Sequence, residues 1–339
     1  MRGVIMHAPG DVRVEERPDP LLEQPTDAII RVTATCVCGS DLWPFRGNDD
    51  VNRHPMGHEY IGVVEQIGDD VRSVAVGDFV VGSFVASDNT CEICQAGFQS
   101  RCVHQVMMGG IGTQAEKARI PLADGTLVKV PGQPTEEQTK SLLAASDVLG
   151  TGWFAADAAA VVPGKTVAVV GDGAVGLMGI LAAKQMGADR IIAMSRHADR
   201  QALARQFGAT DIVEERGEEG IARIKELTNG YGAHSTIEAV GTQESMQQAI
   251  GATRPGGHVG FVGVSHGVEI DGTDLFVATV NLLGGPAPVR RFLPDLIDLI
   301  MTDQINPGIV FDLTLPLEDA AEAYKAMDER RATKVMLTL

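Results

Sequence analysis

Hydrophobic and polar residues alternate differently in the two parts of the chain. Up to about residue 130, short runs with apolar residues at every second position are separated by turns such as Pro9-Gly10-Asp11. This pattern predicts a β-rich region, because successive side chains of a strand point to opposite faces. A helix is predicted after Thr135, which can form a capping box with Gln138. Strands are expected at residues 4–6, 12–14, 28–34, 60–67 and 79–85.

The pattern changes at Pro163. The run Thr166–Val170 predicts a buried strand, and a glycine-rich turn and an apolar helix ending near Met186 follow it. Strands that alternate with helices from here onward indicate a parallel, doubly wound sheet of the α/β class. Further strands are expected at residues 190–194, 211–213, 235–240, 258–264 and 335–339, and further helices at 200–207, 293–301 and 317–327.

The composition is that of an ordinary globular protein, with 44% hydrophobic and 22% charged residues. A length of 339 residues exceeds what one hydrophobic core usually serves, so two domains are expected. The net charge of -17 argues against a nucleic-acid partner, because binding phosphate needs a basic face. No apolar run approaches the ~20 residues of a membrane helix, and the first residues lack the apolar core of a signal peptide. We therefore expect a cytoplasmic protein with no membrane partner.

A dinucleotide fingerprint follows the strand Thr166–Val170. The segment Gly171-Asp172-Gly173-Ala174-Val175-Gly176 matches G-x-G-x-x-G and opens a helix, which is the required context. The first glycine permits the tight turn, the second lets the pyrophosphate approach, and the third lets helix and strand pack closely. The alternative is a purely structural turn.

The end of the next strand indicates which nucleotide is bound. NAD enzymes place an acidic residue there for the ribose hydroxyls, whereas this chain has Ser195, Arg196 and His197. Ser195 can donate a hydrogen bond to a 2′-phosphate and Arg196 can pair with its charge, so NADP(H) is favoured over NAD(H). The alternative is that Arg196 is only a solvated surface residue. Further candidates for the cofactor site are Val240, Val262 and Val264.

Two motifs combine ligands that suit zinc. They are Cys38-Gly39-Ser40-Asp41 and Gly57-His58-Glu59-Tyr60-Ile61-Gly62. A thiolate, an imidazole and a carboxylate form a zinc ligand set, and a catalytic zinc keeps one position open for substrate. Taken singly, Cys38 would be a small buried hydrophobe and His58 a core histidine.

The segment 57–71 matches the pattern G-H-E-x2-G-x5-G-x2-V at every specified position. Together with the Cys38 element and the fingerprint, it makes the chain resemble the zinc-containing medium-chain alcohol dehydrogenases along nearly its whole length. The resemblance implies a GroES-like catalytic domain at residues 1–147 and 287–339 and a Rossmann domain at residues 148–286. It also implies a homodimer or homotetramer, and hydride transfer between the nicotinamide and a small alcohol, aldehyde or ketone.

The resemblance also assigns roles at the catalytic zinc. Cys38 and His58 correspond to the first two ligands, and Asp147 stands where many members have a cysteine, as in some bacterial NADP-linked secondary alcohol dehydrogenases. Glu59 would be an exchangeable fourth ligand or a nearby charge, and Asp41 would accept the second N–H of His58.

Three more positions bear on the reaction. Ser40 would take the alcohol proton, and Thr151 would contact the nicotinamide. Many relatives continue the proton relay through a histidine three residues after the hydroxyl, but this chain has Trp43 there, with His54 as a weak substitute.

A second zinc site is suggested by the cysteines. Cys91, Cys94 and Cys102 supply three of the four ligands of the family's structural-zinc pattern C-x2-C-x2-C-x7-C, and the missing first position is Asp88. A carboxylate can complete a tetrahedral zinc site. The alternative is a metal-free lobe with reduced thiols. The fifth cysteine, Cys36, is expected in the core.

Other functions use the same motifs. Polyol, threonine and formaldehyde-type dehydrogenases share the parts described so far, and a zinc-free quinone or enoyl reductase shares the fold but usually lacks the Cys38 and Gly57-His58-Glu59 elements. A non-enzymatic NADPH-binding protein is the alternative from another class. Retention of Cys38, Ser40, His58 and Asp147 together argues against it.

Overall fold

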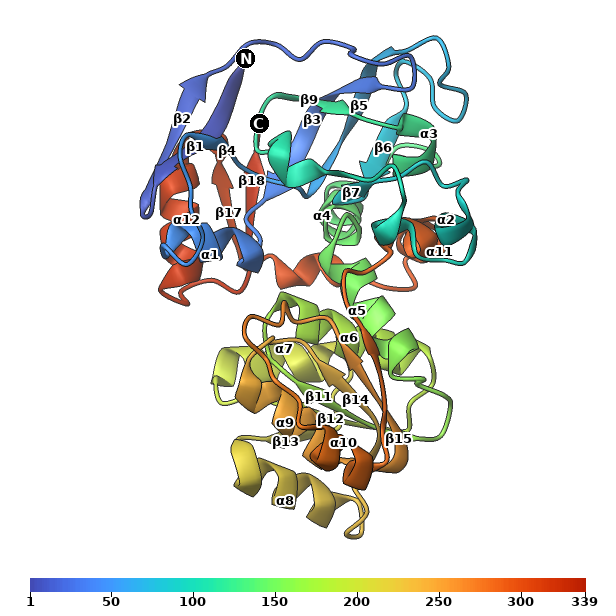
Figure 1. Ribbon diagram of the computed structural model, residues 1–339. Coiled ribbons are helices and arrows are strands. Elements are labelled where there is room, and N and C mark those ends of the chain that lie inside the picture. Colours follow the sequence, from blue (N-terminus) through green and yellow to red (C-terminus); the bar gives the residue numbers. More distant parts are fainter. The chain divides into compact units, whose positions relative to one another are not determined.

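The computed structural model describes residues 1–339 and divides them into two compact units (Figure 1). The first unit contains residues 1–147 and 288–339, and the second contains residues 148–287. None of the helices combines the length and the apolar character needed to cross a membrane.

The first unit is built on an antiparallel sheet with the order β10-β6-β5-β3-β18-β17, in which only β17 and β18 run parallel. Strand β9 pairs with β3, and two smaller sheets are β2-β1-β4 and β7-β8. The strands of this unit are β1 (Arg2–Ala8), β2 (Asp11–Glu16), β3 (Ala28–Cys36), β4 (His54–Pro55), β5 (Tyr60–Ile67), β6 (Phe79–Gly82), β7 (Val85–Ala86), β8 (Val106–Met107), β9 (Lys117–Ile120), β10 (Leu127–Lys129), β17 (Leu313–Pro316) and β18 (Val335–Thr338). The β-rich region expected from the alternating pattern is therefore confirmed.

Short helices connect these strands. The α-helices are α1 (Leu42–Phe45), α2 (Glu92–Gln95), α3 (Ala123–Thr126), α4 (Glu136–Ala145), α11 (Val289–Met301) and α12 (Ala320–Asp328). The 3-10 turns are η1 (Gly39–Asp41), η2 (Gln99–Arg101), η3 (Met108–Gly110), η4 (Pro307–Val310) and η5 (Leu317–Asp319).

Helix α4 begins at the predicted capping box. The hydroxyl of Thr135 accepts a hydrogen bond from the Gln138 amide at 3.2 Å, and the Gln138 side chain accepts one from the Thr135 amide at 3.0 Å. These bonds satisfy amide groups that a helix start leaves without partners. The buried face 141–145 anchors α4 in the unit, and this fixes the backbone that leads into Asp147.

The second unit is a six-stranded parallel sheet with the order β13-β12-β11-β14-β15-β16. Its direction of winding reverses between β11 and β14, which is the point where doubly wound sheets bind their ligands. Helix α6 packs on β11 and β12, and α9 packs on β14 and β15. The strands are β11 (Thr166–Val170), β12 (Arg190–Met194), β13 (Asp211–Val213), β14 (Ala233–Glu238), β15 (Thr253–Phe261) and β16 (Asn281–Gly284). The helices are α5 (Val148–Ala158), α6 (Ala174–Gln185), α7 (Ala198–Phe207), α8 (Gly217–Leu227), α9 (Gln243–Ala252) and α10 (Gly272–Ala278).

Two strands of this sheet end earlier than the sequence predicted. Strand β14 ends at Glu238 instead of Val240, because the buried Glu238 carboxylate accepts the amide hydrogens of Val240 and Gly241, each at 2.8 Å. Strand β15 ends at Phe261, and the chain has left the sheet before it reaches the exposed Val264. Side-chain capping of the backbone thus overrides the apolar pattern at the end of β14.

Candidate metal centres and dinucleotide site

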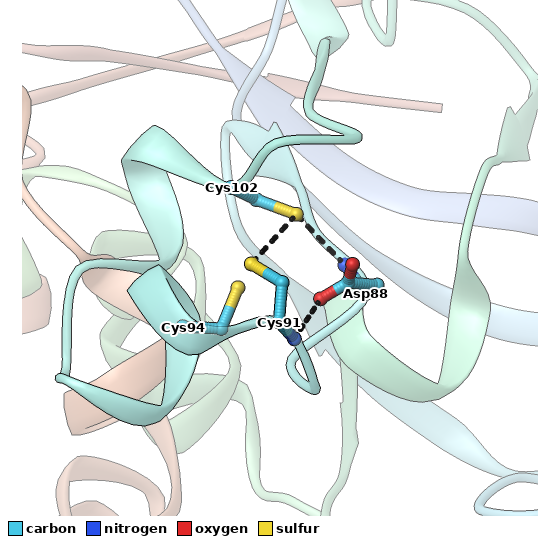
Figure 2. Close-up of side chains that lie close together, drawn as sticks. All are labelled: Asp88, Cys91, Cys94 and Cys102. Atoms are coloured by element: carbon cyan, nitrogen blue, oxygen red, sulfur yellow. Dashed lines mark hydrogen bonds between the residues drawn. The ribbon is translucent and has the colours of Figure 1, made fainter.

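One cluster of metal-binding side chains lies in the loop region that contains α2 and η2. Figure 2 shows Asp88, Cys91, Cys94 and Cys102 turned toward one another, and their ligand atoms all lie within 4.8 Å of one another. The Sγ atoms of Cys91 and Cys102 are 3.9 Å apart. The cysteines form no disulfide.

Hydrogen bonds organise this cluster before any metal is considered. The amides of Asp88 and His104 donate to the Cys102 sulfur at 3.4 and 3.3 Å. The Asp88 carboxylate accepts the Cys91 amide at 3.0 Å, and its second oxygen is 2.7 Å from Nδ1 of His104. These contacts hold four possible metal ligands close together.

The second cluster contains Cys38, His58, Glu59 and Asp147, whose ligand atoms also lie within 4.8 Å of one another. Nε2 of His58 is 3.4 Å from the Asp147 carboxylate, and the Cys38 sulfur is 4.0 Å from the same oxygen. All four side chains are largely buried. Three separate chain segments therefore bring a thiol, an imidazole and two carboxylates to one point.

Local structure fixes the first two of these residues. Cys38 follows β3 at the start of η1, and its amide donates to the Asp41 carboxylate at 3.0 Å. The other Asp41 oxygen lies 3.4 Å from Nδ1 of His58, so the ring presents Nε2 to the cluster. Gly57 has a φ of +96°, and a Cβ there would approach Gln114 to 2.5 Å. Only glycine fits at this position. The turn that it permits brings the next residue, His58, beside Cys38.

The sequence did not indicate Lys334, which contacts this cluster. Its Nζ donates to Oε1 of Glu59 at 2.8 Å and to the carbonyl of Val37 at 3.3 Å. Burial opposes the charge on Lys334, but the neighbouring Cys36 and Glu59 raise its pKa well above the ordinary value. Lys334 is therefore an ammonium ion inside the first unit. A lysine directly before a strand looks like a surface residue in the sequence, so no local signal could have revealed it.

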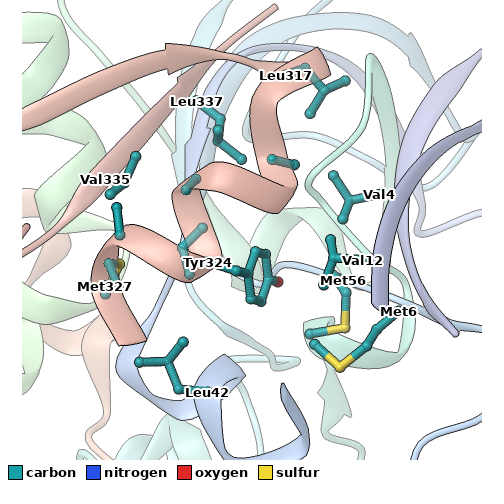
Figure 3. Close-up of a cluster of buried hydrophobic side chains, with 14 of the residues drawn as sticks. Val4, Met6, Val12, Leu42, Met56, Leu317, Tyr324, Met327, Val335 and Leu337 are labelled. Carbon is teal, nitrogen blue, oxygen red and sulfur yellow. The ribbon is translucent and has the colours of Figure 1, made fainter. Parts of the chain in front are cut away.

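A buried hydrogen-bond chain extends behind His58. Nε2 of Gln114 donates to Asp41 at 3.2 Å, and the hydroxyl of Tyr324 donates to Oε1 of Gln114 at 3.0 Å. The ring of Tyr324 is fixed among apolar side chains of β1, β2, β18 and α12 (Figure 3). The hydrophobic core of the first unit thus holds the acceptor that orients His58.

Both clusters fit zinc. A tetrahedral ion with bonds of 2.0–2.3 Å places its ligand atoms about 3.3–3.8 Å from one another, close to the separations found here. Oε2 of Glu59 is buried and has no hydrogen-bond partner. A buried carboxylate oxygen without a partner is costly, and a cation beside it would remove that cost.

The fingerprint loop fits a pyrophosphate. Gly171 has a φ of +119°, and a Cβ on Gly176 would lie 2.0 Å from the carbonyl oxygen of Gly171, so helix α6 packs directly against the loop. A Cβ on Gly173 would meet nothing within 4 Å, and no side chain caps the amino terminus of α6 there. The first amides of the helix are thus open to an anion.

At the end of β12, Asp172 of the fingerprint loop makes contacts that the sequence did not predict. Ser195 is buried, and its hydroxyl donates to the Asp172 carboxylate at 2.8 Å, while Arg200 contacts the other Asp172 oxygen at 3.2 Å. Arg196 and His197 are exposed. The donor predicted for a 2′-phosphate is therefore engaged with Asp172 in this structure.

The remaining predicted residues lie in different surroundings. Ser40 is exposed on η1, and Trp43 is half-buried in α1. Thr151 is buried in α5, and Cys36 is buried in the core as expected. In the second unit, Val240 and Val264 are exposed and Val262 is half-buried.

Comparisons with known proteins identify the family. The zinc-binding dehydrogenase model matches residues 174–300, and the alcohol dehydrogenase GroES-like domain model matches residues 24–132. Zinc-type alcohol dehydrogenase B of Aspergillus flavus is 36% identical, over 99% of this chain and 81% of that protein. A probable zinc-binding alcohol dehydrogenase of Mycobacterium tuberculosis is also 36% identical, over 100% of this chain and 88% of that protein.

A solved structure gives the same result. Alcohol dehydrogenase TADH from Thermus sp. ATN1 aligns with a TM-score of 0.91 and 31% identity, covering 100% of this chain and 99% of that one. The fold is accordingly a GroES-like domain joined to a Rossmann-type parallel sheet. The chain belongs to the zinc-dependent medium-chain alcohol dehydrogenase family.

Proposed function

We propose that this zinc-dependent alcohol dehydrogenase transfers hydride between NADP(H) and a small alcohol, aldehyde or ketone. In this proposal Cys38, His58 and Asp147 hold the catalytic zinc, and Glu59 is a fourth, exchangeable ligand. The observation that carries the ligand assignment is the approach of all four ligand atoms to within 4.8 Å of one another. The structural zinc would be held by Asp88 and the three neighbouring cysteines.

The chemistry divides between the cofactors and the side chains. Zinc would supply a Lewis acid for the substrate oxygen, and the nicotinamide would exchange a hydride with the carbon that bears it. Asp147 offers an oxygen where many relatives have a thiolate, and oxygen donates less charge to a metal. Asp41 keeps Nδ1 of His58 engaged, so that Nε2 remains available as a ligand.

Ser40 is proposed to take the proton of the substrate hydroxyl. It lies two residues after Cys38, and it is exposed. A proton that reaches this hydroxyl can therefore pass directly to water. The presence of Trp43 at the usual histidine position is then compatible with turnover, because no further side chain is required.

Two features support NADP(H) as the preferred nucleotide. No acidic residue occupies positions 194–197 at the end of β12, and Arg196 is exposed there. A guanidinium pairs well with a phosphate, and a carboxylate at this place would select the unphosphorylated ribose instead.

The family resemblance further suggests a homodimer or homotetramer. Strand β16 forms an edge of the parallel sheet, and Leu283 on it is 48% exposed. Sedimentation velocity of the zinc-loaded protein would distinguish the two assemblies from a monomer.

The test measures turnover of a panel of primary alcohols, secondary alcohols and polyols and of the matching carbonyl compounds. Each substrate is assayed with NADP(H) and with NAD(H). We expect oxidation of NADPH by a simple aldehyde or ketone, lost with a chelator and restored by zinc, and a higher kcat/KM with NADP than with NAD. Activity that survives complete zinc removal would contradict the metal assignment. A higher kcat/KM with NAD would contradict the nucleotide assignment alone.

A further inference from the structure

A carboxylate is present at the end of β12, although the strand itself supplies none. It belongs to Asp172, the second residue of the fingerprint loop that follows β11. Its two oxygens are bound separately, one by the Ser195 hydroxyl at 2.8 Å and the other by the Arg200 guanidinium at 3.2 Å. The side chains of Asp172 and Arg200 are 13% and 15% exposed. A partly desolvated ion pair therefore lies where the adenosine ribose of a dinucleotide is bound in this fold.

Two arginines with different surroundings are found here. Arg196 is exposed, whereas Arg200 on α7 is committed to Asp172. A 2′-phosphate would be attracted by both arginines and repelled by the carboxylate of Asp172. It would also compete with Asp172 for Arg200, and such charge interactions are strong where water is partly excluded.

We propose that Asp172 is the residue that limits the preference for NADP over NAD. Its carboxylate restrains Arg200 and opposes a 2′-phosphate, while it tolerates an uncharged ribose hydroxyl. This inference rests on the proposed nucleotide site at the end of β12. The choice between NADP and NAD would then depend on a residue of the fingerprint loop as well as on the residues at the end of β12.

The structural alternative is that Asp172 only ties the loop to the strand. Asp172→Asn separates the two roles, because the amide oxygen can still accept the Ser195 hydrogen bond while the negative charge is lost. Asp189→Asn is the matched control. Asp189 is exposed, and it precedes β12 at the opposite end of the strand. The two ends of β12 are separated by five residues of about 3.3 Å each. This distance exceeds the Debye length of about 8 Å in physiological salt, so the charge of Asp189 is screened from the nucleotide site.

The experiment measures binding and not turnover, by calorimetric titration of the zinc-loaded protein with adenosine 2′,5′-bisphosphate and with 5′-AMP. The Kd ratio of the two probes isolates the contribution of the 2′-phosphate. We expect Asp172→Asn to tighten the bisphosphate by about tenfold and to change 5′-AMP by less than about threefold, the size of effect that removal of one close like charge produces. Arg200→Met should weaken the bisphosphate, and Asp189→Asn should leave the ratio at the wild-type value.

Each contrary outcome has a distinct meaning. If Asp172→Asn weakens both probes equally, or leaves their ratio unchanged, Asp172 is a structural tie and the inference is wrong. If the wild-type protein binds 5′-AMP more tightly than the bisphosphate, the NADP assignment fails. The role of Asp172 would still be tested by whether Asp172→Asn changes the ratio of the two Kd values. Thermal unfolding of each variant shows whether the fold is retained.

Discussion

The ammonium of Lys334 donates a 2.8 Å hydrogen bond to Oε1 of Glu59, and the two side chains are 1% and 0% exposed. These residues are 275 positions apart in the chain. The bond joins the residue before β18 to the segment before β5 that carries His58. One oxygen of Glu59 is thereby neutralised, and the other, without a partner, remains with the cluster of Cys38, His58 and Asp147.

Removing Lys334 should destabilise the first unit. Lys334→Met leaves Glu59 as a buried carboxylate without its cation, and loss of one partner from a buried ion pair typically costs about 3–5 kcal/mol. We expect the free energy of unfolding, from urea denaturation of the chelator-treated protein, to fall by that amount, because zinc would otherwise be a second cation beside Glu59. Lys334→Arg keeps a positive charge and should retain most of the wild-type stability.

The double variant Lys334→Met/Glu59→Gln tests the reason for this loss. It removes both charges and should recover a large part of the stability lost in Lys334→Met, because no unpaired charge stays buried. If the free energy of unfolding of Lys334→Met lies within about 0.5 kcal/mol of the wild-type value, Lys334 and Glu59 do not form an ion pair in the folded protein.

Asp147 is the most exacting test of the catalytic site, because a single position carries its assignment. Asp147→Ala should lower the zinc content of dialysed protein from about two ions per chain to about one, since the remaining ion is held in the separate four-ligand cluster. Asp147→Cys is the matched control: a thiolate also binds zinc, so the content should stay near two. Full zinc retention in Asp147→Ala would remove this residue from the ligand set.

The two clusters of possible metal ligands were predictable from the sequence to different degrees. Asp88, Cys91, Cys94 and Cys102 occur in one short segment, so these neighbours in sequence remain neighbours in space. Cys38, His58 and Asp147 lie in three separate segments, and only the family resemblance grouped them. The alternation of strands and helices predicted the parallel sheet, since its period depends on local geometry.

The partners of those residues were not predictable. Lys334 meets Glu59, and Tyr324 meets Gln114, only after distant strands have paired, and nothing adjacent to these residues marks them as buried. Asp172 illustrates a different limit. The sequence placed it in the fingerprint, but only the fold shows that its carboxylate reaches Ser195. A comparison of residue types at one strand end cannot detect a group supplied by the neighbouring loop.

The cysteine lobe should lose its metal independently of the catalytic cluster. Cys94→Ser removes one ligand of a closed site, so zinc content should fall to about one ion per chain and the segment 88–104 should become easier to cleave with protease. Cys36→Ala is the control, because Cys36 belongs to neither ligand cluster and should leave the metal content unchanged. Equal protease resistance of Cys94→Ser and wild type would argue for a metal-free lobe.

His234 should make the second unit less stable in mild acid. Burial lowers its pKa, and the positive charges of Arg254 and Lys165 lower it further. The ring nitrogens also face hydrogen-bond donors, with Nδ1 at 3.3 Å from the Thr166 amide and Nε2 at 3.2 Å from Arg254. A protonated ring would direct an N–H at both donors, whereas a neutral ring can accept at one nitrogen, so protonation is disfavoured in the folded chain.

The sign of the effect follows from this preference. The unfolded ring has a pKa near 6.5, so below that pH the unfolded chain binds a proton that the folded chain resists. The stabilising contribution of the neutral ring is therefore complete above pH 6.5, and it is lost as the pH falls through the lowered folded pKa. The Tm of the wild type should drop more steeply between pH 7.5 and about pH 5.5 than that of His234→Gln, which cannot titrate in this range. Parallel Tm curves for the two proteins would show that His234 takes up its proton equally well in the folded and unfolded chains.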